Sequence, residues 1–245
     1  MVAILSLLAI VVLIPILIAL LLLIPAVQNK VVDWAALYAS EFFGSELLIG
    51  GIYLEPFTTV RLDDVLIRDF KGDTLIFSSA IHVQLHSIKT ESIEINLDEV
   101  EVENGYFNLV IYENDSLSNL QHWMEAFPSS SDSSASGDVV IRSNEVRLKD
   151  MQFVFENQNI ESAGPRQVDF NHLGVDGLSG RFTNVSIVND SITANMYGLQ
   201  LEEKSGFKIK HFTAHASVNS NVIRCSDMTL VTNTATVNGT YEMQS

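Results

Sequence analysis

Beyond residue 46, apolar and polar residues alternate along most of the chain. Ile81, Val83 and Leu85 alternate with polar residues, and Ile93, Ile95 and Leu97 repeat the same two-residue period. Successive side chains of a β-strand point to opposite faces, so this period predicts strands with one apolar and one polar face. Antiparallel sheets with one face in water have this pattern. The predicted fold class is therefore mainly β, with an antiparallel sheet.

The alternation is interrupted at several places by a doubled polar position. The spacing there is apolar-x-apolar-x-x-apolar-x-apolar, with Asp63-Asp64, Asp98-Glu99, Lys149-Asp150, Lys210-His211 and Ser226-Asp227 as the doubled pairs. A strict period would turn the second half of each segment to the wrong face, whereas the inserted residue of a β-bulge restores the facing and bends the strand. A tight turn between two strands is the alternative interpretation. A bulge or a turn at each doubled pair predicts a sheet whose strands all bend at corresponding positions, which gives an elongated trough.

The apolar positions of these segments are predicted to share the interior of the trough. They are Val60, Leu62, Val65, Ile67, Ile81, Val83, Leu85, Ile93, Ile95, Leu97, Val100, Val102, Val146, Leu148, Met151, Phe153, Phe155, Phe207, Ile209, Phe212, Ile223, Met228 and Leu230. A continuous apolar strip of this kind suits an acyl chain, because burial of apolar surface is favourable.

Two segments have helical spacing instead. The stretch 29–43 reads as a short amphipathic helix, and 117–127 reads as another that ends before Pro128. The Ser-rich stretch 128–137 predicts a flexible linker. Asn104-Gly105 and Asn238-Gly239 are turn or hairpin signals. Strand pattern continues to about residue 243, so we expect the sheet to be truncated at the C-terminus.

The chain begins with an apolar run that is long enough to cross a membrane. Val2–Ile24 contains Leu13 and other aliphatic residues, with only Ser6 and Pro15 as interruptions. A helix of this length measures roughly 35 Å, against a hydrocarbon core of ~30 Å. Pro15 should kink this helix. A signal peptide is the alternative, but its apolar region is usually only about 7–15 residues long. We expect a retained single-pass anchor.

The predicted organisation has four parts. They are a transmembrane anchor at 1–28, the start of the β-trough with its short helices at 29–127, the linker at 128–137, and the continuing trough at 138–245.

Charge is distributed unevenly along the chain. No charged residue precedes Lys30, and the whole chain carries a formal net charge of −16. This balance argues against binding to nucleic acid and against adhesion to anionic lipid headgroups. It is compatible with a domain exported across the membrane. The lone Cys225 supplies no disulfide framework.

Residues 36–127 resemble the N-terminal region of TamB-type translocation/assembly modules, especially those of Bacteroidetes, within the AsmA-like group. The matching pieces are EFFGSELLIGGIYL (41–54), VRLDDVLIRDFKGDTLIF (60–77), SIEINLDEVEVENGYFNLVIYEND (92–115) and LSNLQHWMEAF (117–127). Gly72-Asp73-Thr74-Leu75 in its context is the most specific of them. The chain departs from the family in lacking a basic start before the span and in being much shorter.

The resemblance implies an inner-membrane anchor and a periplasmic β-sheet rolled into an apolar groove, the AsmA-like β-taco. It also implies carriage of phospholipid between the inner and outer membranes in support of outer-membrane biogenesis. Family members are further linked to outer-membrane protein assembly with a barrel partner of the TamA/BamA type, which we expect to dock through a C-terminal region absent from this chain.

No residue pattern predicts an enzyme, a metal site or a cofactor. The histidine pairs His82/His86 and His211/His215 lack accompanying ligands and read as exposed strand residues. The cluster Asp63, Asp64, Asp69 and Asp73 lacks calcium-loop spacing and reads as solvated turn carboxylates. Glu99, Glu101 and Glu103 read as a wet strand face. Three functions stay open: a lipid conduit, an assembly scaffold that adds strands at its edges, and a tethered β-sandwich with a closed core.

Overall fold

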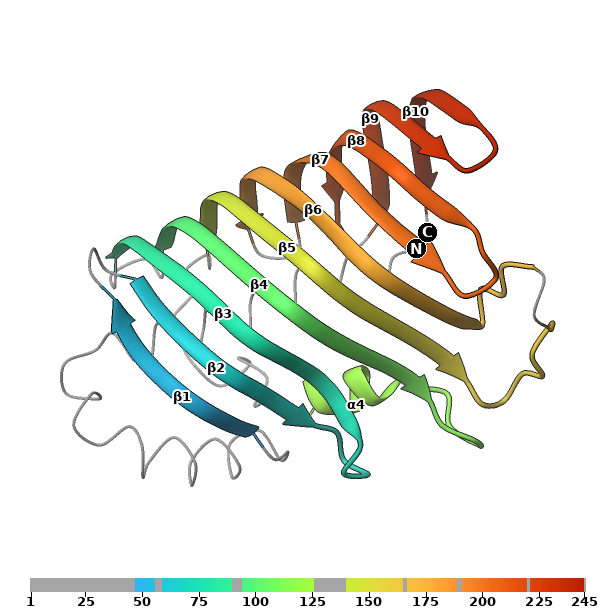
Figure 1. The fold of residues 1–245 in the computed structure, drawn as a ribbon, viewed down its shortest axis with the longest axis horizontal. Coiled ribbons are helices and arrows are strands. Elements are labelled where there is room, and N and C mark those ends of the chain that lie inside the picture. The colour runs from blue at the N-terminus through green and yellow to red at the C-terminus, as the bar shows by residue number, and fades with distance from the viewer. Residues whose placement is uncertain are drawn as a thin grey trace.

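The computed structural model of this protein describes residues 47–55, 59–89, 94–125, 140–164, 167–188, 191–219 and 221–244. Ten strands and one short helix make up the described elements (Figure 1). They are β1 Leu47–Glu55, β2 Thr59–Arg68, β3 Thr74–Lys89, β4 Glu94–Ile111, α4 Asn119–Glu125, β5 Val140–Asn157, β6 His172–Val188, β7 Ser191–Glu203, β8 Lys208–Val218, β9 Val222–Thr232 and β10 Thr236–Gln244.

The ten strands form one open sheet in sequence order, from β1 to β10. The prediction of a mainly β fold is confirmed. The prediction of an antiparallel sheet is wrong at one place, because β4 and β5 are parallel while every other neighbouring pair is antiparallel. Two parallel neighbours require a connection that returns to the same end of the sheet. Here that connection is residues 112–139, which include α4.

The doubled polar pairs lie inside strands, which excludes the alternative of tight turns. Asp63-Asp64 lies in β2, Asp98-Glu99 in β4, Lys149-Asp150 in β5, Lys210-His211 in β8 and Ser226-Asp227 in β9. Asp64, Asp150 and Asp227 have φ angles of 50°, 53° and 52°. Left-handed residues within a strand are typical of bulges, and aspartate tolerates this conformation better than most residues.

The bulges keep the apolar residues on one face, as predicted. In β4, Ile95 and Leu97 precede the Asp98-Glu99 pair, while Val100 and Val102 follow it. All four are at most 6% exposed. The register of β4 against β3 passes from Gln84–Glu99 to Leu85–Leu97, so Asp98 is the inserted residue.

Interruptions of the pairing line up from strand to strand and cross the whole sheet. Between β1 and β2 the register passes from Ile49–Val65 to Gly51–Asp63. We call the aligned positions the bend line: Gly50, Asp64, Ser79, Asn104, Asp150, Ser179, Gly198, Thr213, Asp227 and Thr240. Its left-handed residues include Asn104, which sits in the middle of β4 with φ 47°. Asn104-Gly105 and Asn238-Gly239 are therefore not hairpin turns, and the hairpin prediction is wrong, because both pairs lie within strands.

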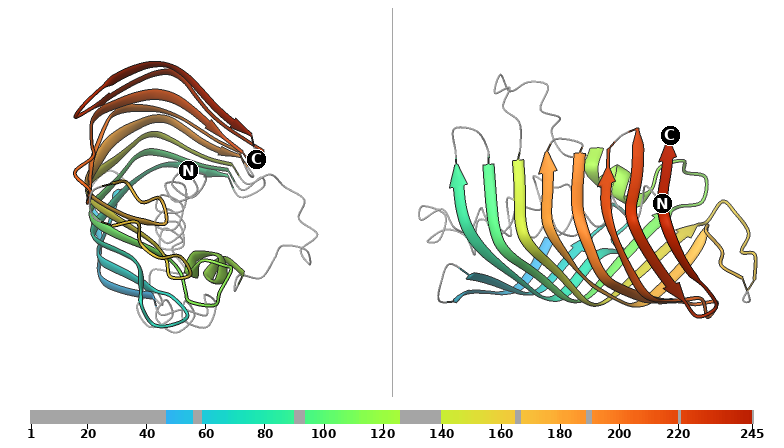
Figure 2. Two further views of the ribbon diagram at one scale, coloured as in Figure 1. Left: turned by 90° about the vertical axis from the view of Figure 1, so that its right-hand side faces the viewer. Right: turned by 90° about the horizontal axis from the view of Figure 1, so that it is seen from above.

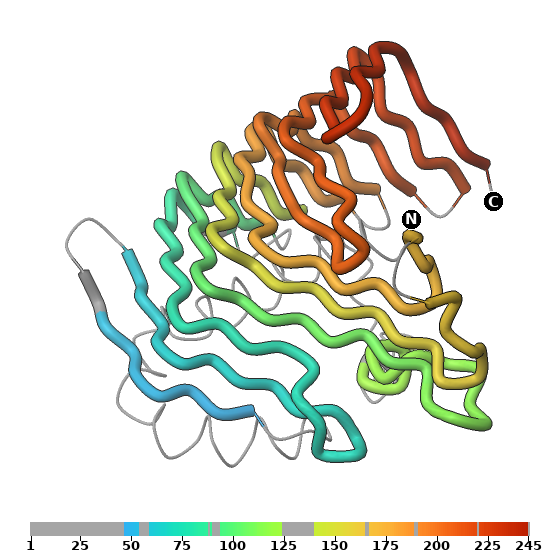
Figure 3. The backbone as a smooth tube through the Cα atoms, turned by 45° about the vertical axis from the view of Figure 1, so that its right-hand side comes forward, coloured from blue at the N-terminus to red at the C-terminus, as the bar shows by residue number. Residues whose placement is uncertain are grey.

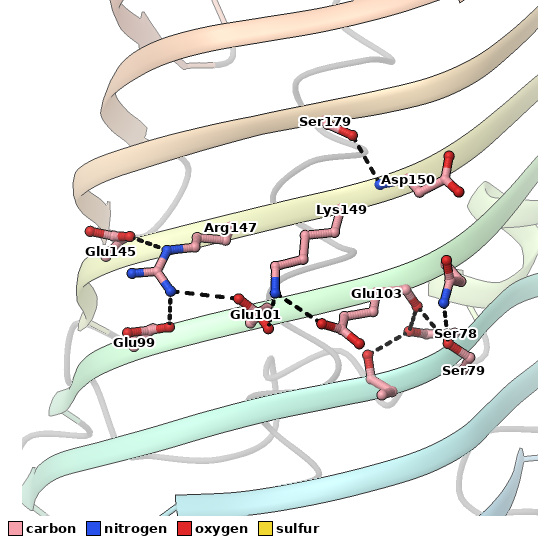
Figure 4. Close-up of polar contacts among 12 residues, drawn as sticks. Ser78, Ser79, Glu99, Glu101, Glu103, Glu145, Arg147, Lys149, Asp150 and Ser179 are labelled. Atoms are coloured by element: carbon pink, nitrogen blue, oxygen red, sulfur yellow. Dashed lines mark hydrogen bonds and ion pairs between the residues drawn. The ribbon is translucent and has the colours of Figure 1, made fainter.

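Serine hydroxyls replace ladder hydrogen bonds that are lost at the bend line (Figure 4). Ser78 Oγ and Ser79 Oγ donate to the carbonyl oxygen of Glu103, at 3.0 and 3.2 Å. The backbone N–H of Asp150 donates to Ser179 Oγ at 2.9 Å. Buried backbone groups need such partners, because an unpaired one costs about as much as a lost hydrogen bond.

The aligned bulges accompany a pronounced curvature of the sheet. Figure 2 shows the strands bending together into a C-shaped section, and Figure 3 shows that the strands fold over from β3 to β10. The helix α4 lies within the curve (Figure 2). Its Leu120 and Trp123 belong to the same buried cluster as the apolar side chains of the strands. The apolar face of the sheet is therefore the concave face.

Some predictions fall outside the described residues. They are the span Val2–Ile24 with Leu13 and Pro15, the helix at 29–43, the linker at 128–137, and Ile93. The helix predicted at 117–127 is present as Asn119–Glu125 within the described chain. No helix in this part of the chain is long and apolar enough to cross a bilayer.

Candidate functional site

The concave face is the largest continuous feature that the predicted residues form. Most of the predicted interior side chains are buried there in one cluster: Val60, Leu62, Val65, Ile67, Ile81, Val83, Ile95, Leu97, Val100, Val102, Val146, Leu148, Met151 and Phe153. Four more are partly buried against it: Leu85, Phe155, Phe212 and Met228. Ile223 is buried outside this cluster, and Phe207, Ile209 and Leu230 are half-buried. The cluster includes a stacked pair, Phe107 and Phe153, with ring centroids 5.9 Å apart.

Burial on this face decreases towards β10. Val60 in β2 and Val100 in β4 are fully buried. In β7 and β8 the residues on the rim side of the bend line, Leu199, Leu201 and Phe212, are only partly buried. In β10, Val237 pairs with Leu230 and Tyr241 with Cys225, so both side chains continue the apolar face. They are 46% and 38% exposed. The apolar side chains of this face are thus buried near β2–β5 and exposed near β10.

The convex face carries a ladder of opposite charges between β4 and β5 (Figure 4). The parallel register places Glu101 beside Arg147 and Glu103 beside Lys149. Lys149 Nζ contacts Glu101 at 2.6 Å and Glu103 at 3.0 Å, and Arg147 Nη1 contacts Glu99 at 2.7 Å. The hydrogen bonds to the two glutamates raise the pKa of Lys149. Exposed pairs like these contribute little stability each. They do show that the glutamate run lies on the polar face, as predicted.

One group on this face has the composition of a metal site. His82, Glu101 and Glu103 each offer a ligand atom, and these atoms lie within 4.8 Å of one another. His82 is half-buried, whereas His86, His211 and His215 are exposed. The two carboxylates already pair with Lys149. Because that pairing neutralises part of their charge, the group does not by itself indicate a metal.

A polar network ties the loop between β2 and β3 to the end of β4. Tyr112 Oη lies 2.6 Å from Asp69 Oδ2 and 2.8 Å from Asp73 Oδ2. Asn119 Nδ2 donates to the same oxygen of Asp69 at 3.1 Å. Burial, with the hydrogen bonds to the two carboxylates, raises the pKa of Tyr112. This network contains Asp73 of the Gly72-Asp73-Thr74-Leu75 piece, so that piece has a structural role.

The network corrects the prediction for Asp69, which is not a solvated turn carboxylate. Its side chain is 4% exposed and also accepts hydrogen bonds from the backbone N–H groups of Lys71 and Asp73. A carboxylate that accepts this many donors can be buried at acceptable cost. Asp63 instead pairs with Arg61 at 2.7 Å, and Asp64 is exposed at its bulge.

One buried carboxylate on the apolar face, Glu203, was not predicted from the sequence. Glu203 is the last residue of β7 and pairs with Val175 of β6, which belongs to the buried cluster. It is 3% exposed. The period-two pattern of β7 could have indicated that the Glu203 side chain lies on the apolar face, because Glu203 follows Leu199 and Leu201 at intervals of two residues.

The sequence matches no protein-family model, and no curated protein matches it.

Proposed function

We propose that this protein is an inner-membrane-anchored, periplasmic carrier of phospholipid acyl chains, of the TamB/AsmA-like type. In this proposal the curved sheet is a groove, and its concave face is the lipid path between the inner and outer membranes. The observation that carries the proposal is the single open sheet, whose buried apolar face runs from β1 to β9. The exposed Val237 and Tyr241 continue this face in β10. An acyl chain needs a continuous apolar surface, and the charged convex face keeps the outside in water.

The closed-sandwich alternative fits the described residues less well. A sandwich covers the apolar face of one sheet with a second sheet. The described strands all belong to one sheet. The partly buried strip Leu199, Leu201 and Phe212 is where an acyl chain would first contact the face.

Site-specific photo-crosslinking tests the conduit. A photo-reactive residue at Phe212 on the concave face is expected to label phospholipid in membranes. Tyr197 of β7 is the matched control, because it is an aromatic residue 41% exposed and its ring lies 5.3 Å from the Arg181 guanidinium on the convex face. Equal labelling at the two positions, or none at either, would refute the proposal.

The proposed location needs a separate experiment. Protease added to spheroplasts should digest residues beyond the apolar run, because the proposal places them in the periplasm. A protected domain, or a mature N-terminus near Val27, would contradict the anchor and the location.

The second candidate function is an assembly scaffold for outer-membrane proteins, working with a barrel partner. Among the described strands, β10 lies at one edge of the sheet and its Val237 and Tyr241 side chains are exposed, which favours this function. Exposed edges accept strands from partners. A crosslinker placed at Gln244 should capture unfolded outer-membrane protein. The same crosslinker at Glu55, in the opposite edge strand β1, is the control and should capture none.

A further inference from the structure

Among the described residues, the apolar face contains one buried acid and no buried lysine or arginine. Three carboxylates are buried among the described residues: Asp69, Asp169 and Glu203. Asp69 and Asp169 lie in loops, and several donors surround each of them. Glu203 lies at the end of a strand with its side chain on the apolar face. No Lys or Arg is buried anywhere among the residues that the structure describes.

The hydrogen-bonding capacity of Glu203 is only half used. Oε2 accepts from the backbone N–H of Ser205 at 2.8 Å. Oε1 is inaccessible to water and has no hydrogen-bond partner. A carboxylate oxygen without water or a donor is unfavourable, and charged groups carry a larger penalty than neutral ones. The unmet capacity is therefore for a donor, preferably a cationic one.

The surroundings of Glu203 indicate where that donor would come from. The strip Leu199–Leu201 leads along β7 directly to Glu203, and the strip is only partly buried. The tight turn Glu203–Phe207 bounds the carboxylate at the rim, closed by a 2.8 Å hydrogen bond from the Glu203 N–H to the Phe207 carbonyl. Lys204 and Gly206 of this turn are exposed. Glu203 thus lies at the rim end of the apolar strip, beside an exposed turn. This is where the headgroup of a lipid would lie if its acyl chain followed the strip, and binding would require the side chains that cover Oε1 to move aside.

We propose that Glu203 binds the ammonium group of a phospholipid whose headgroup carries a primary amine, with an acyl chain lying along Leu199 and Leu201. The inference rests on the proposed function and names the lipid class for the same face. A primary ammonium offers hydrogens to Oε1, whereas the quaternary ammonium of a choline headgroup has none to offer. An anionic glycerol headgroup would place negative charge near the carboxylate and is disfavoured.

The test uses the full chain, purified in detergent and incubated with vesicles of equal parts phosphatidylethanolamine, phosphatidylcholine and phosphatidylglycerol. Lipid recovered with the protein is then quantified by mass spectrometry. Wild-type protein is expected to enrich phosphatidylethanolamine about tenfold, as a charge-assisted hydrogen bond would give. Glu203→Gln should abolish the enrichment. Glu202→Gln is the matched control, since Glu202 is the neighbouring acid, is exposed and pairs with Lys208 at 2.7 Å.

Each outcome decides the matter. Enrichment that persists in Glu203→Gln, or that Glu202→Gln abolishes equally, overturns the inference. Bound lipid with the composition of the vesicles also overturns it while leaving the conduit intact. Recovery of no lipid by wild type overturns the conduit and the inference together. A second measurement needs no substitution in the protein. Lipids whose ethanolamine nitrogen carries one, two or three methyl groups should be recovered with the protein in stepwise smaller amounts. Equal recovery of all of them would refute the role of the ammonium hydrogens.

Discussion

At the scale of single residues, the bend line depends on side chains that tolerate the left-handed conformation. Asp64, Asn104, Asp150 and Asp227 adopt it in strands where other residues would be strained. Asp and Asn are the non-glycine residues that visit this region most readily, whereas a β-branched residue there is a genuine outlier. The bends are therefore encoded by residue type at a few positions.

Replacing Asp150 with valine should test this encoding. Asp150→Val is expected to lower the free energy of unfolding by about 1–2 kcal/mol, the cost of a left-handed conformation for an ordinary residue. Asp150→Gly removes the same carboxylate but tolerates φ 53°, so it should change stability much less. Urea unfolding of both variants is the measurement. Equal destabilisation by valine and glycine would show that the carboxylate matters and the conformation does not.

Asp169 should make stability depend on pH in the acid range. Its pKa is lowered to about 2, chiefly by a hydrogen bond from the backbone N–H of Ala163. Hydrogen bonds from the backbone N–H of Asn171 and from the His172 ring lower it further. An unfolded aspartate titrates near about 3.9, so the unfolded chain binds more protons between these values. The stabilisation is complete above about pH 4 and is lost as pH falls towards 2.

Asp169→Asn should therefore flatten the fall in stability across this pH window. Unfolding by urea at a series of pH values measures it, with wild type in parallel. Identical slopes for the two proteins between pH 4 and pH 2 would contradict the assignment.

Residue patterns predicted the bulges but misread some of the same residue types elsewhere. The doubled polar pairs were informative because two apolar pairs flanked each one in a fixed spacing. Asn104-Gly105 suggested a hairpin, since asparagine in the left-handed region serves both hairpin turns and bulges. Only the pairing of β4 with β3 and β5 distinguishes the two uses. Asp69 was misread because its two side-chain donors, Tyr112 and Asn119, come from residues 40 or more positions away.

At the scale of elements, the parallel step between β4 and β5 is the feature that pattern analysis could not predict. A period of two identifies a strand and its faces, but it carries no information about the direction of a neighbour. The helix at 119–125 was detectable from its spacing, and its place in the connection between two parallel strands follows from the topology. The parallel register also creates the charge ladder, because it sets Arg147 and Lys149 beside the glutamates of β4.

Burial predicts different effects of a charge in different strands of the concave face. Val102 in β4 is 1% exposed, so Val102→Asp buries an unpaired carboxylate and should cost several kcal/mol, enough to unfold a marginal domain. Leu201 in β7 is only partly buried, so Leu201→Asp should leave the fold intact. Thermal unfolding of the full chain separates the two. A folded Val102→Asp protein would mean that this part of the face is open to water.

The partly buried strip also distinguishes folding from transport. If the concave face carries lipid, Leu201→Asp should reduce phospholipid crosslinking at Phe212 while the melting temperature stays near that of wild type. Unchanged crosslinking with normal stability would mean that Leu201 does not line a lipid path. Phe153→Asp, at a side chain 4% exposed, is the control that should unfold like Val102→Asp.

At the scale of the whole molecule, the sheet has two unlike ends. Near β2–β5 the apolar side chains of the concave face are buried, and near β10 they are exposed. The sequence predicted which residues share this face but not the gradient of exposure. Exposure depends on how strongly the sheet curves and on what lies opposite each strand, and neither is encoded locally. The candidate headgroup site was missed for the same reason, since Glu203 looks like any strand-end acid until its burial is known.

The open end has a consequence for how copies of the chain would meet in solution. In the described part of the sheet, β10 is an edge strand with exposed Val237 and Tyr241, and it contains neither the lysine nor the proline that usually protects an edge. Two copies joined β10 to β10 would be related by a twofold axis perpendicular to the sheet, so both apolar faces would lie on the same side and the assembly would stop at a dimer. Light scattering should show a concentration-dependent dimer that Val237→Lys disrupts. A contact from β10 to β1 has no such symmetry, so it would repeat without limit and give growing fibres instead.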